Sequence, residues 1–182
     1  MLNFDRCNKR GWFATRFASI HNGNVCNRIE ACFDTGCVNT YIGLYALSVL
    51  TNLSVDVISN FIKEHSDKES ITYGISANNQ TNKSYPVVIE EVNIGGLNVK
   101  NFRCSVNLDE SIAKTSGFTK LEDEYIQIEP YILIGLDFIT AFQEIEFNNK
   151  TISCDKFNSV IYASNNTYKK NELVSFKSLY TC

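Results

Sequence analysis

One hairpin that ends in an acidic loop constrains the fold of this chain more than any other feature. Residues 12–20 mix aromatic, β-branched and polar side chains as strands do, and residues 21–24 carry an Asn-Gly turn signal. A second predicted strand, 25–33, follows the turn and breaks abruptly into Asp34-Thr35-Gly36, a triplet that occurs once in the 182 residues. An apolar run that stops at an acid, a hydroxyl and a glycine predicts a tight loop presenting a carboxylate.

The length and composition suit one packed domain. The chain has 182 residues, 44% of them hydrophobic, with only two prolines. A net charge of −3 gives no polybasic surface for nucleic acid or an anionic membrane. No apolar run approaches the roughly 18 residues that span a bilayer, and residues 1–10 lack a hydrophobic signal core. We therefore expect a soluble, cytoplasmic protein with no nucleic-acid or membrane partner.

The cysteines do not form a disulfide or metal pattern. There are seven, an odd number, at positions 7, 26, 32, 37, 104, 154 and 182. Without a secretion signal, most are expected to be reduced thiols. His21, Cys26, Cys32 and Cys37 are the one set worth testing as zinc ligands, but no Cys-x-x-Cys spacing occurs among them. We expect no metal and no cofactor.

The rest of the chain predicts further strands and one substantial helix. Ser54 is a plausible N-cap for a helix over 55–65, whose apolar residues share one face. Strands over 71–75 and 84–92 predict a hairpin with a polar turn between them, and Gly95-Gly96 predicts a tight turn rather than a phosphate-binding loop. Other expected elements are a strand and helical turn in 41–53, strands at 102–106 and 131–135, a loop with a short helix in 109–129, a short helix at 137–142, a hairpin in 144–154, and strand-like pieces at 160–162 and 173–176.

In this order, the elements resemble the retropepsin-like (retroviral-type) aspartic proteases, which are single-lobe and homodimeric. The similarity covers about 12–154. Residues 31–37 with Thr40 resemble the catalytic loop, 71–92 the flap hairpin, 92–97 the turn after the flap, and 132–139 the hydrophobic-hydrophobic-Gly element behind the loop. No second Asp-[Ser/Thr]-Gly loop is present, so one chain would hold half of an active site.

The resemblance implies a mostly-β, single-lobe acid-protease fold: a closed β-barrel with one or two helices and a flap hairpin. It places the protease domain at 1–156 and leaves 157–182 as a C-terminal extension that can supply dimer-interface strands. It implies a homodimeric aspartic endopeptidase that acts on a protein, a peptide or its own precursor. The implied residues are Asp34, Thr35 and Gly36 for catalysis, Tyr73, Gly74, Ile75, Ser76 and Ala77 for the flap and substrate, and Thr40, Ile134 and Gly135 for loop support.

Three departures from the viral pattern separate this chain from the viral enzymes. Cys37 replaces an alanine, Val38 stands where an aspartate is usual, and Leu136 stands where an arginine is usual. In the viral enzymes this aspartate and arginine pair electrostatically. Because both are missing here, no buried charge is left without a partner. We interpret this as a non-viral, bacterial or mobile-element branch that supports its loop by apolar packing.

Several alternatives remain open at this point. Taken alone, an Asp-Thr-Gly after a strand is more often an ordinary turn. Cys37 is a nucleophile or, more in keeping with its surroundings, a small buried thiol. Tyr73 is a flap tyrosine or a half-buried strand aromatic. For the whole protein, the rival is a catalytically inactive dimeric peptide-binding module with the same fold, and a third option is a chain whose site needs a different partner.

Overall fold

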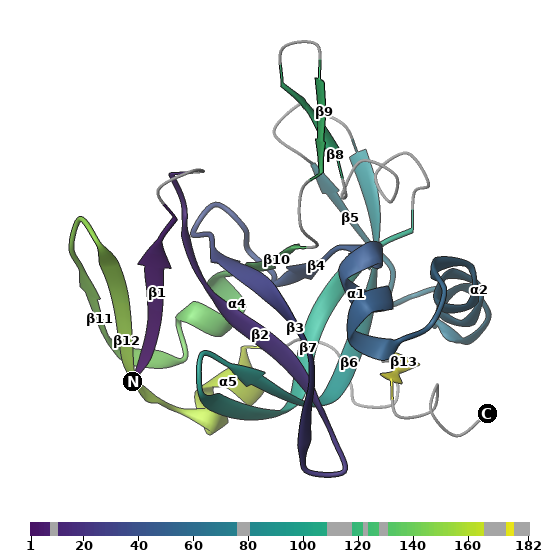
Figure 1. The fold of residues 1–182 in the computed structure, drawn as a ribbon. Helices are drawn as coiled ribbons and strands as arrows, with labels where there is room; N and C mark the ends of the chain where they lie inside the picture. The colour runs from purple at the N-terminus through teal and green to yellow at the C-terminus, as the bar shows by residue number, and fades with distance from the viewer. Residues whose placement is uncertain are drawn as a thin grey trace.

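A closed β-barrel forms the centre of the molecule (Figure 1). The computed structural model describes residues 1–7, 11–75, 81–108, 118–121, 124–127, 131–165 and 174–176. Six strands pair in the order β2, β3, β10, β4, β7, β6, and β6 pairs again with β2, which closes the barrel. Their bounds are β2 (Phe13–His21), β3 (Asn24–Phe33), β4 (Tyr41–Ile42), β6 (Thr81–Ile94), β7 (Leu97–Asn107) and β10 (Tyr131–Ile134). The expected mostly-β fold with a closed barrel is confirmed.

The first hairpin forms as the turn signal predicts. β2 and β3 pair antiparallel from Ala14↔Cys32 to His21↔Asn24. Asn22 and Gly23 both have positive φ, at 49° and 78°. Two consecutive positive φ values are what a two-residue hairpin turn of matching twist requires, and Asn-Gly adopts them at low cost.

A three-stranded edge lies beside the barrel and includes a strand that the sequence analysis missed. β1 (Leu2–Arg6) pairs with β12 (Thr151–Phe157), which forms a hairpin with β11 (Phe142–Phe147). The β11–β12 hairpin was predicted, whereas residues 1–10 were treated only as a polar terminus. Leu2 and Phe4 are buried, so the alternation of apolar and polar residues was the signal for β1. Figure 1 shows the three strands side by side next to the N-terminus.

Four helices occur in the described part of the chain, and two of them are eight residues or longer. They are α1 (Leu44–Thr51), α2 (Val55–His65), and the short α4 (Leu136–Ile139) and α5 (Ser159–Ser164). The Ser54 side chain accepts a hydrogen bond from Val57 N, so the predicted cap of α2 is confirmed. The strand predicted at 160–162 is wrong: the Asn158 side chain accepts from the backbone N–H groups of Val160 and Ile161 and starts α5 there.

No single helix among the described residues has the length and apolar composition needed to cross a membrane. α1 and α2 together have that length and composition, but the two helices are bent by 104° relative to each other.

The predicted hairpin after α2 is present, and its turn lies outside the described residues. β5 (Thr72–Ile75) pairs with β6 from Thr72↔Ser84 to Ile75↔Thr81. In the stretch predicted as loop and short helix, the described residues form a separate two-stranded sheet, β8 (Phe118–Leu121) with β9 (Glu124–Gln127). The short helix expected there stays a prediction, because residues 109–117, 122–123 and 128–129 of this stretch lie outside the described residues.

The described parts of the C-terminal extension pack against the barrel of the same chain. β13 (Val174–Ser175) adds to β6 in parallel, and Phe176 beside it is buried. Tyr162 of α5 is also buried, and its hydroxyl accepts a hydrogen bond from Arg103 N at 2.9 Å. The expected boundary at residue 156 falls within β12. A role for residues 157–182 in a dimer stays a prediction.

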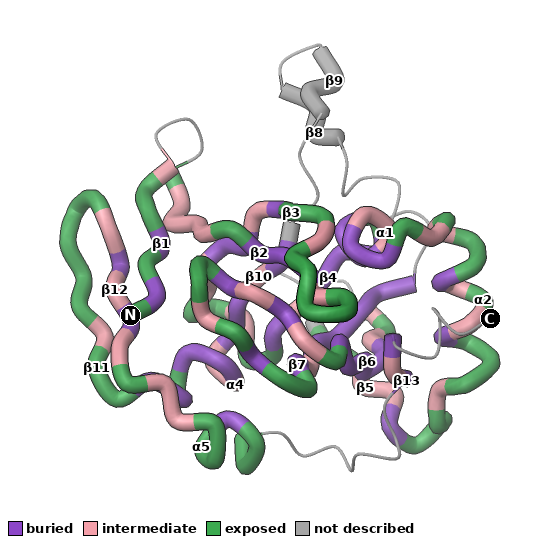
Figure 2. Tube along the Cα trace, turned by 60° about the horizontal axis from the view of Figure 1, so that its bottom comes forward, coloured by how far each residue is buried: buried purple, intermediate pink, exposed green. Residues whose placement is uncertain are grey.

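An aromatic cluster forms the part of the core that lies behind α4. Phe138 of α4 contacts the rings of Phe102, Phe142, Phe157 and Tyr162 at centroid distances of 5.3–5.7 Å. The buried positions in Figure 2 run through the barrel strands and α4, whereas the outer hairpin of β11 is largely exposed. Since aromatic pairs add to the free energy of burial, this cluster fixes α4 and the residues just before it.

Candidate active site

The loop that carries Asp34 crosses the end of a strand inserted between its own two flanking strands. β3 precedes the loop and β4 follows it, yet β10 lies between them, parallel to β3 and antiparallel to β4. The chain from Asp34 to Thr40 must therefore pass over the C-terminal end of β10, at Ile134 and Gly135. This topology brings two segments about a hundred residues apart into direct contact.

Backbone hydrogen bonds join the two segments along their length. Asp34 N donates to Ile134 O at 3.1 Å, so the loop that carries Asp34 begins beside the last residue of β10. In the other direction, Leu136 N donates to Cys37 O at 2.9 Å, and Asp137 N donates to Val38 O at 3.0 Å. These bonds fix the path of the loop on both sides of Gly135.

Thr40 and Asp137 complete this contact with a buried polar network. The Asp137 carboxylate oxygen Oδ1 accepts from Thr40 N at 2.8 Å and from the Thr40 hydroxyl at 2.7 Å. The Thr40 hydroxyl oxygen in turn accepts from Gly135 N at 3.1 Å. Thr40 is fully buried, so its polar groups cannot bond to water and need these hydrogen bonds in its place. We call the contact between residues 34–40 and 134–137 the loop clamp.

Burial works against the charge on Asp137. Desolvation raises the pKa of its carboxyl above the ordinary range, while the hydrogen bonds from Thr40 and Phe138 N lower it and offset part of that shift. The carboxylate therefore gains hydrogen bonds at the expense of its hydration. Its two hydrogen bonds with Thr40 hold the end of the loop in place.

Position 135 needs a glycine because there is no room for a Cβ atom, and not because of its backbone angles. Its φ of −89° suits any residue. A Cβ atom there would lie 2.6 Å from the carbonyl carbon of Asn39 and 2.8 Å from Thr40 N, both backbone atoms that cannot move aside alone. The glycine therefore lets the two halves of the loop clamp approach each other.

The predicted catalytic residues lie at the outer side of the loop clamp. Asp34 is half-buried, and Thr35 and Gly36 are exposed. Asp34 Oδ1 accepts a hydrogen bond from Gly36 N at 2.8 Å, which orients the carboxylate within its own loop. The structure thus presents one oriented carboxylate on a fixed loop, beside an exposed hydroxyl.

Apolar packing does not support this loop, contrary to the sequence interpretation. Val38 is 69% exposed, and Leu136 is only half-buried. The support comes from the backbone bonds and the Thr40–Asp137 network instead. A carboxylate does stand in the interior, one residue beyond Leu136, and its compensation is hydrogen bonding to neutral groups in place of an ion pair.

Cys37 has the character of a structural thiol. Its Sγ donates to Asn39 O at 2.9 Å. Burial, followed by the negative charges of Asp34 and Asp137, raises the pKa of the thiol to about 11. Because the thiolate is the reactive form, this environment suppresses nucleophilic chemistry at neutral pH.

Three of the hairpin residues expected to meet substrate, Tyr73, Gly74 and Ile75, lie on β5 and take no part in the loop clamp. Tyr73 is 70% exposed and Gly74 is exposed. Ile75 ends the strand, and Ser76 and Ala77 lie outside the described residues. This exposure argues against the half-buried strand aromatic considered from the sequence and leaves the flap tyrosine as a prediction.

Asp137 is the site residue that sequence analysis missed. It was assigned only to the start of a short helix. A signal was available: an acid two residues after a strand-ending glycine, close to where the resemblance places the support of the catalytic loop. Nothing in the sequence, however, pairs it with Thr40, which is 97 positions away.

Comparisons with known proteins add one structural likeness. No protein-family model matches the sequence, and no curated protein matches it. Among solved structures, the chain is similar to the crystal structure of a retropepsin-like aspartic protease from Rickettsia conorii, with 16% identity and a TM-score of 0.42. The match covers 83% of this chain and 87% of that chain. A likeness at this level does not assign an activity, so the case for one rests on the residues of the loop.

Proposed function

We propose that this protein is a homodimeric aspartic endopeptidase of the retropepsin-like kind. The observation that carries the proposal is the loop clamp: buried polar contacts hold a loop whose half-buried carboxylate, Asp34, is oriented by Gly36 N. An ordinary turn does not need such support. Because the chain has one Asp-Thr-Gly loop, a second copy must supply the second carboxylate.

The reaction follows from bringing two such carboxylates together. Two carboxylates a few ångströms apart hold one proton between them, the arrangement for which aspartic proteases are the standard example. The ionised Asp34 acts as general base on a shared water, which attacks the peptide carbonyl. The protonated Asp34 of the second subunit donates to the developing oxyanion and then helps to protonate the leaving nitrogen. No covalent intermediate forms.

Neighbouring residues position the reacting groups. The exposed hydroxyl of Thr35 braces the two loops across the dimer axis by bonding to the backbone of the second copy. Gly36, also exposed, lets substrate approach without a Cβ in the way. The β5–β6 hairpin acts as the flap, and its strands hold the substrate in an extended conformation, with Tyr73 facing it.

The substrate class is an unfolded or extended protein segment, including a precursor of this chain. We also propose that the enzyme works in the cytoplasm. The six cysteines among the described residues are all free thiols, which suits a reducing compartment.

The test is cleavage of an unfolded protein by the wild type and by Asp34→Asn, across acid to neutral pH. Loss of the acid–base group is expected to lower the rate at least about a hundredfold, with the dimer intact by sedimentation. Asp56→Asn, an exposed acid on α2, is the matched control and should cut like the wild type. Excess Asp34→Asn protein mixed with wild type should also lower the activity, because mixed dimers lack one carboxylate.

Each opposite outcome has a definite meaning. Cleavage by Asp34→Asn at the wild-type rate would contradict the mechanism. A monomer that cleaves at full rate would contradict the composite site. A wild-type dimer that cuts nothing and ignores a statine-type inhibitor, yet binds extended peptides, would establish the inactive binding module instead.

A further inference from the structure

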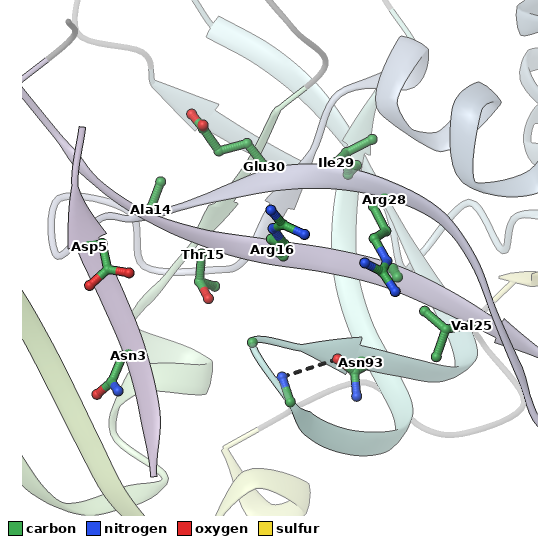
Figure 3. Close-up of a pocket in the computed structure, with 13 residues that line it drawn as sticks. Asn3, Asp5, Ala14, Thr15, Arg16, Val25, Arg28, Ile29, Glu30 and Asn93 are labelled. Atoms are coloured by element: carbon green, nitrogen blue, oxygen red, sulfur yellow. Dashed lines mark hydrogen bonds between the residues drawn. The ribbon is translucent and has the colours of Figure 1, made fainter. Parts of the chain in front are cut away.

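A long groove on the side of the barrel has no part in the loop clamp. It lies between β1, the β2–β3 ribbon and the β6–β7 turn, with a volume of about 800 Å³ (Figure 3). It forms because β2 changes partners: its first residues pair with β1, whereas Phe17–Ser19 pair with β6. Asn3 and Asp5 of β1 line one end, and Val25 of β3 lines the other.

Two arginines give this groove its charge. Arg16 and Arg28 stand on neighbouring strands, since Arg16 pairs in register with Glu30 and Ala18 pairs with Arg28. Both side chains are exposed, and neither has a hydrogen-bond or ion-pair partner among the residues that the structure describes. In a chain of net charge −3, two unpaired guanidinium groups form a local cationic site.

Glu30, the acid that pairs in register with Arg16, points away from the two arginines. Glu30 Oε1 accepts a hydrogen bond from Trp12 Nε1 at 3.2 Å. Figure 3 shows its carboxylate directed away from both guanidinium groups. At the other end, Asp5 Oδ1 accepts from the Thr151 hydroxyl at 3.2 Å. Both acids that line the groove therefore have hydrogen-bond partners other than the two arginines.

The shape of the groove favours an extended peptide over a small anion. It follows β3 from Val25 to Glu30, which at about 3.4 Å per residue is about 17 Å. An extended segment of about five residues spans this length. A phosphate ion would occupy only a fraction of this space.

We infer that the groove binds an extended, acidic peptide segment of about five residues, with its carboxylates on Arg16 and Arg28. In an extended segment, alternate side chains point to the same side, so acids two residues apart face the arginine pair together. Guanidinium–carboxylate contacts give the orientation, because they are charge-assisted and can form in pairs. This site is separate from Asp34 and does not depend on proteolysis.

The experiment measures the binding of a labelled Glu-Ala-Glu-Ala-Glu peptide to the Asp34→Asn protein by fluorescence anisotropy, so that no cleavage interferes. The Gln-Ala-Gln-Ala-Gln peptide is expected to bind at least about tenfold more weakly. The double variant Arg16→Glu/Arg28→Glu should lose at least about tenfold in affinity for the acidic peptide. Both positions are exposed, so the variant should fold.

The matched control is Lys63→Glu/Lys68→Glu, which makes the same change in net charge at two exposed lysines outside the groove. It should bind within about twofold of the parent protein. Equal binding of both peptides, no binding of either, or equal losses in the two double variants would overturn the inference. Full competition by inorganic phosphate at the peptide's own concentration would assign the groove to a small anion instead.

Discussion

The loop clamp and the β5–β6 hairpin are both assigned to the proposed active site, yet they are built in opposite ways. Thr40 in the loop clamp is fully buried and makes three hydrogen bonds through its hydroxyl and N–H, whereas Tyr73 on the hairpin is 70% exposed. Gly135 has backbone atoms where a Cβ would stand, whereas Gly74 has nothing within 4 Å. The difference separates a part that must hold a charge in place from a part that must meet a variable ligand.

The two glycines offer the sharpest test of this contrast. Gly135→Ala should lower the free energy of unfolding by about 3 kcal/mol, because the new methyl group must displace the backbone of Asn39 and Thr40. Gly74→Ala should leave stability unchanged or raise it by a few tenths of a kcal/mol, since its site is open. Urea unfolding of both variants measures this. Equal effects would mean that the loop clamp is no tighter than the hairpin.

Removal of the buried acid should come next in size. Asp137→Ala leaves the Thr40 N–H and hydroxyl without their acceptor, which should cost about 2–3 kcal/mol. Asp56→Ala on the exposed face of α2 is the matched control and should change stability by less than about 0.5 kcal/mol. If the proposed function holds, Asp137→Ala should also lower the rate of cleavage by displacing Asp34. A variant as stable as the control would show that the network does not support the loop.

The pH dependence of stability should differ between the wild type and Asp137→Asn, in which the side chain cannot ionise. Burial raises the pKa of this carboxyl in the folded protein, so the folded state binds more protons than the unfolded state in the carboxyl range. The contribution of Asp137 is therefore fully present at low pH and is lost as pH rises through the raised pKa. Asp137→Asn keeps an oxygen acceptor and lacks this titration.

Relative to the wild type, Asp137→Asn should thus become more stable as pH rises from about 3 to about 7, and the difference should then level off. Urea unfolding of both proteins across this range gives the difference directly. A constant difference, or one that shrinks with rising pH, would contradict the raised pKa.

The smallest effect on stability is expected on the hairpin. Tyr73→Ala removes an exposed side chain and should change the free energy of unfolding by less than about 0.5 kcal/mol. If the hairpin is the flap, the same change should raise KM for a protein substrate severalfold. A large loss of stability would show that Tyr73 is part of the core, and an unchanged KM would remove it from the substrate site.

Local signals predicted the elements that depend on neighbouring residues. Asn22-Gly23 places the first hairpin, and Ser54 caps α2, because each effect acts within a few positions. The same kind of signal was misjudged at residues 160–162, where β-branched and aromatic side chains favour a strand but Asn158 starts a helix. There the packing of Tyr162 on the aromatic cluster outweighs propensity.

The support of the loop could not be predicted in this way. Val38 and Leu136 suggested apolar packing because their neighbours in space were unknown. Asp137 lies 97 positions from Thr40, and only the insertion of β10 between β3 and β4 brings them together. The groove with Arg16 and Arg28 has the same origin, since it exists where β2 passes from β1 to β6.

The sequence by itself therefore determined that a single carboxylate stands on a tight loop after a strand, because that depends on residue types in one short run. Only the tertiary structure decided what holds the loop and what lies beside it. Hydrogen bonds of Thr40 with Asp137 and the close approach at Gly135 depend on which strands are neighbours, and strand order is set by the packing of the whole barrel.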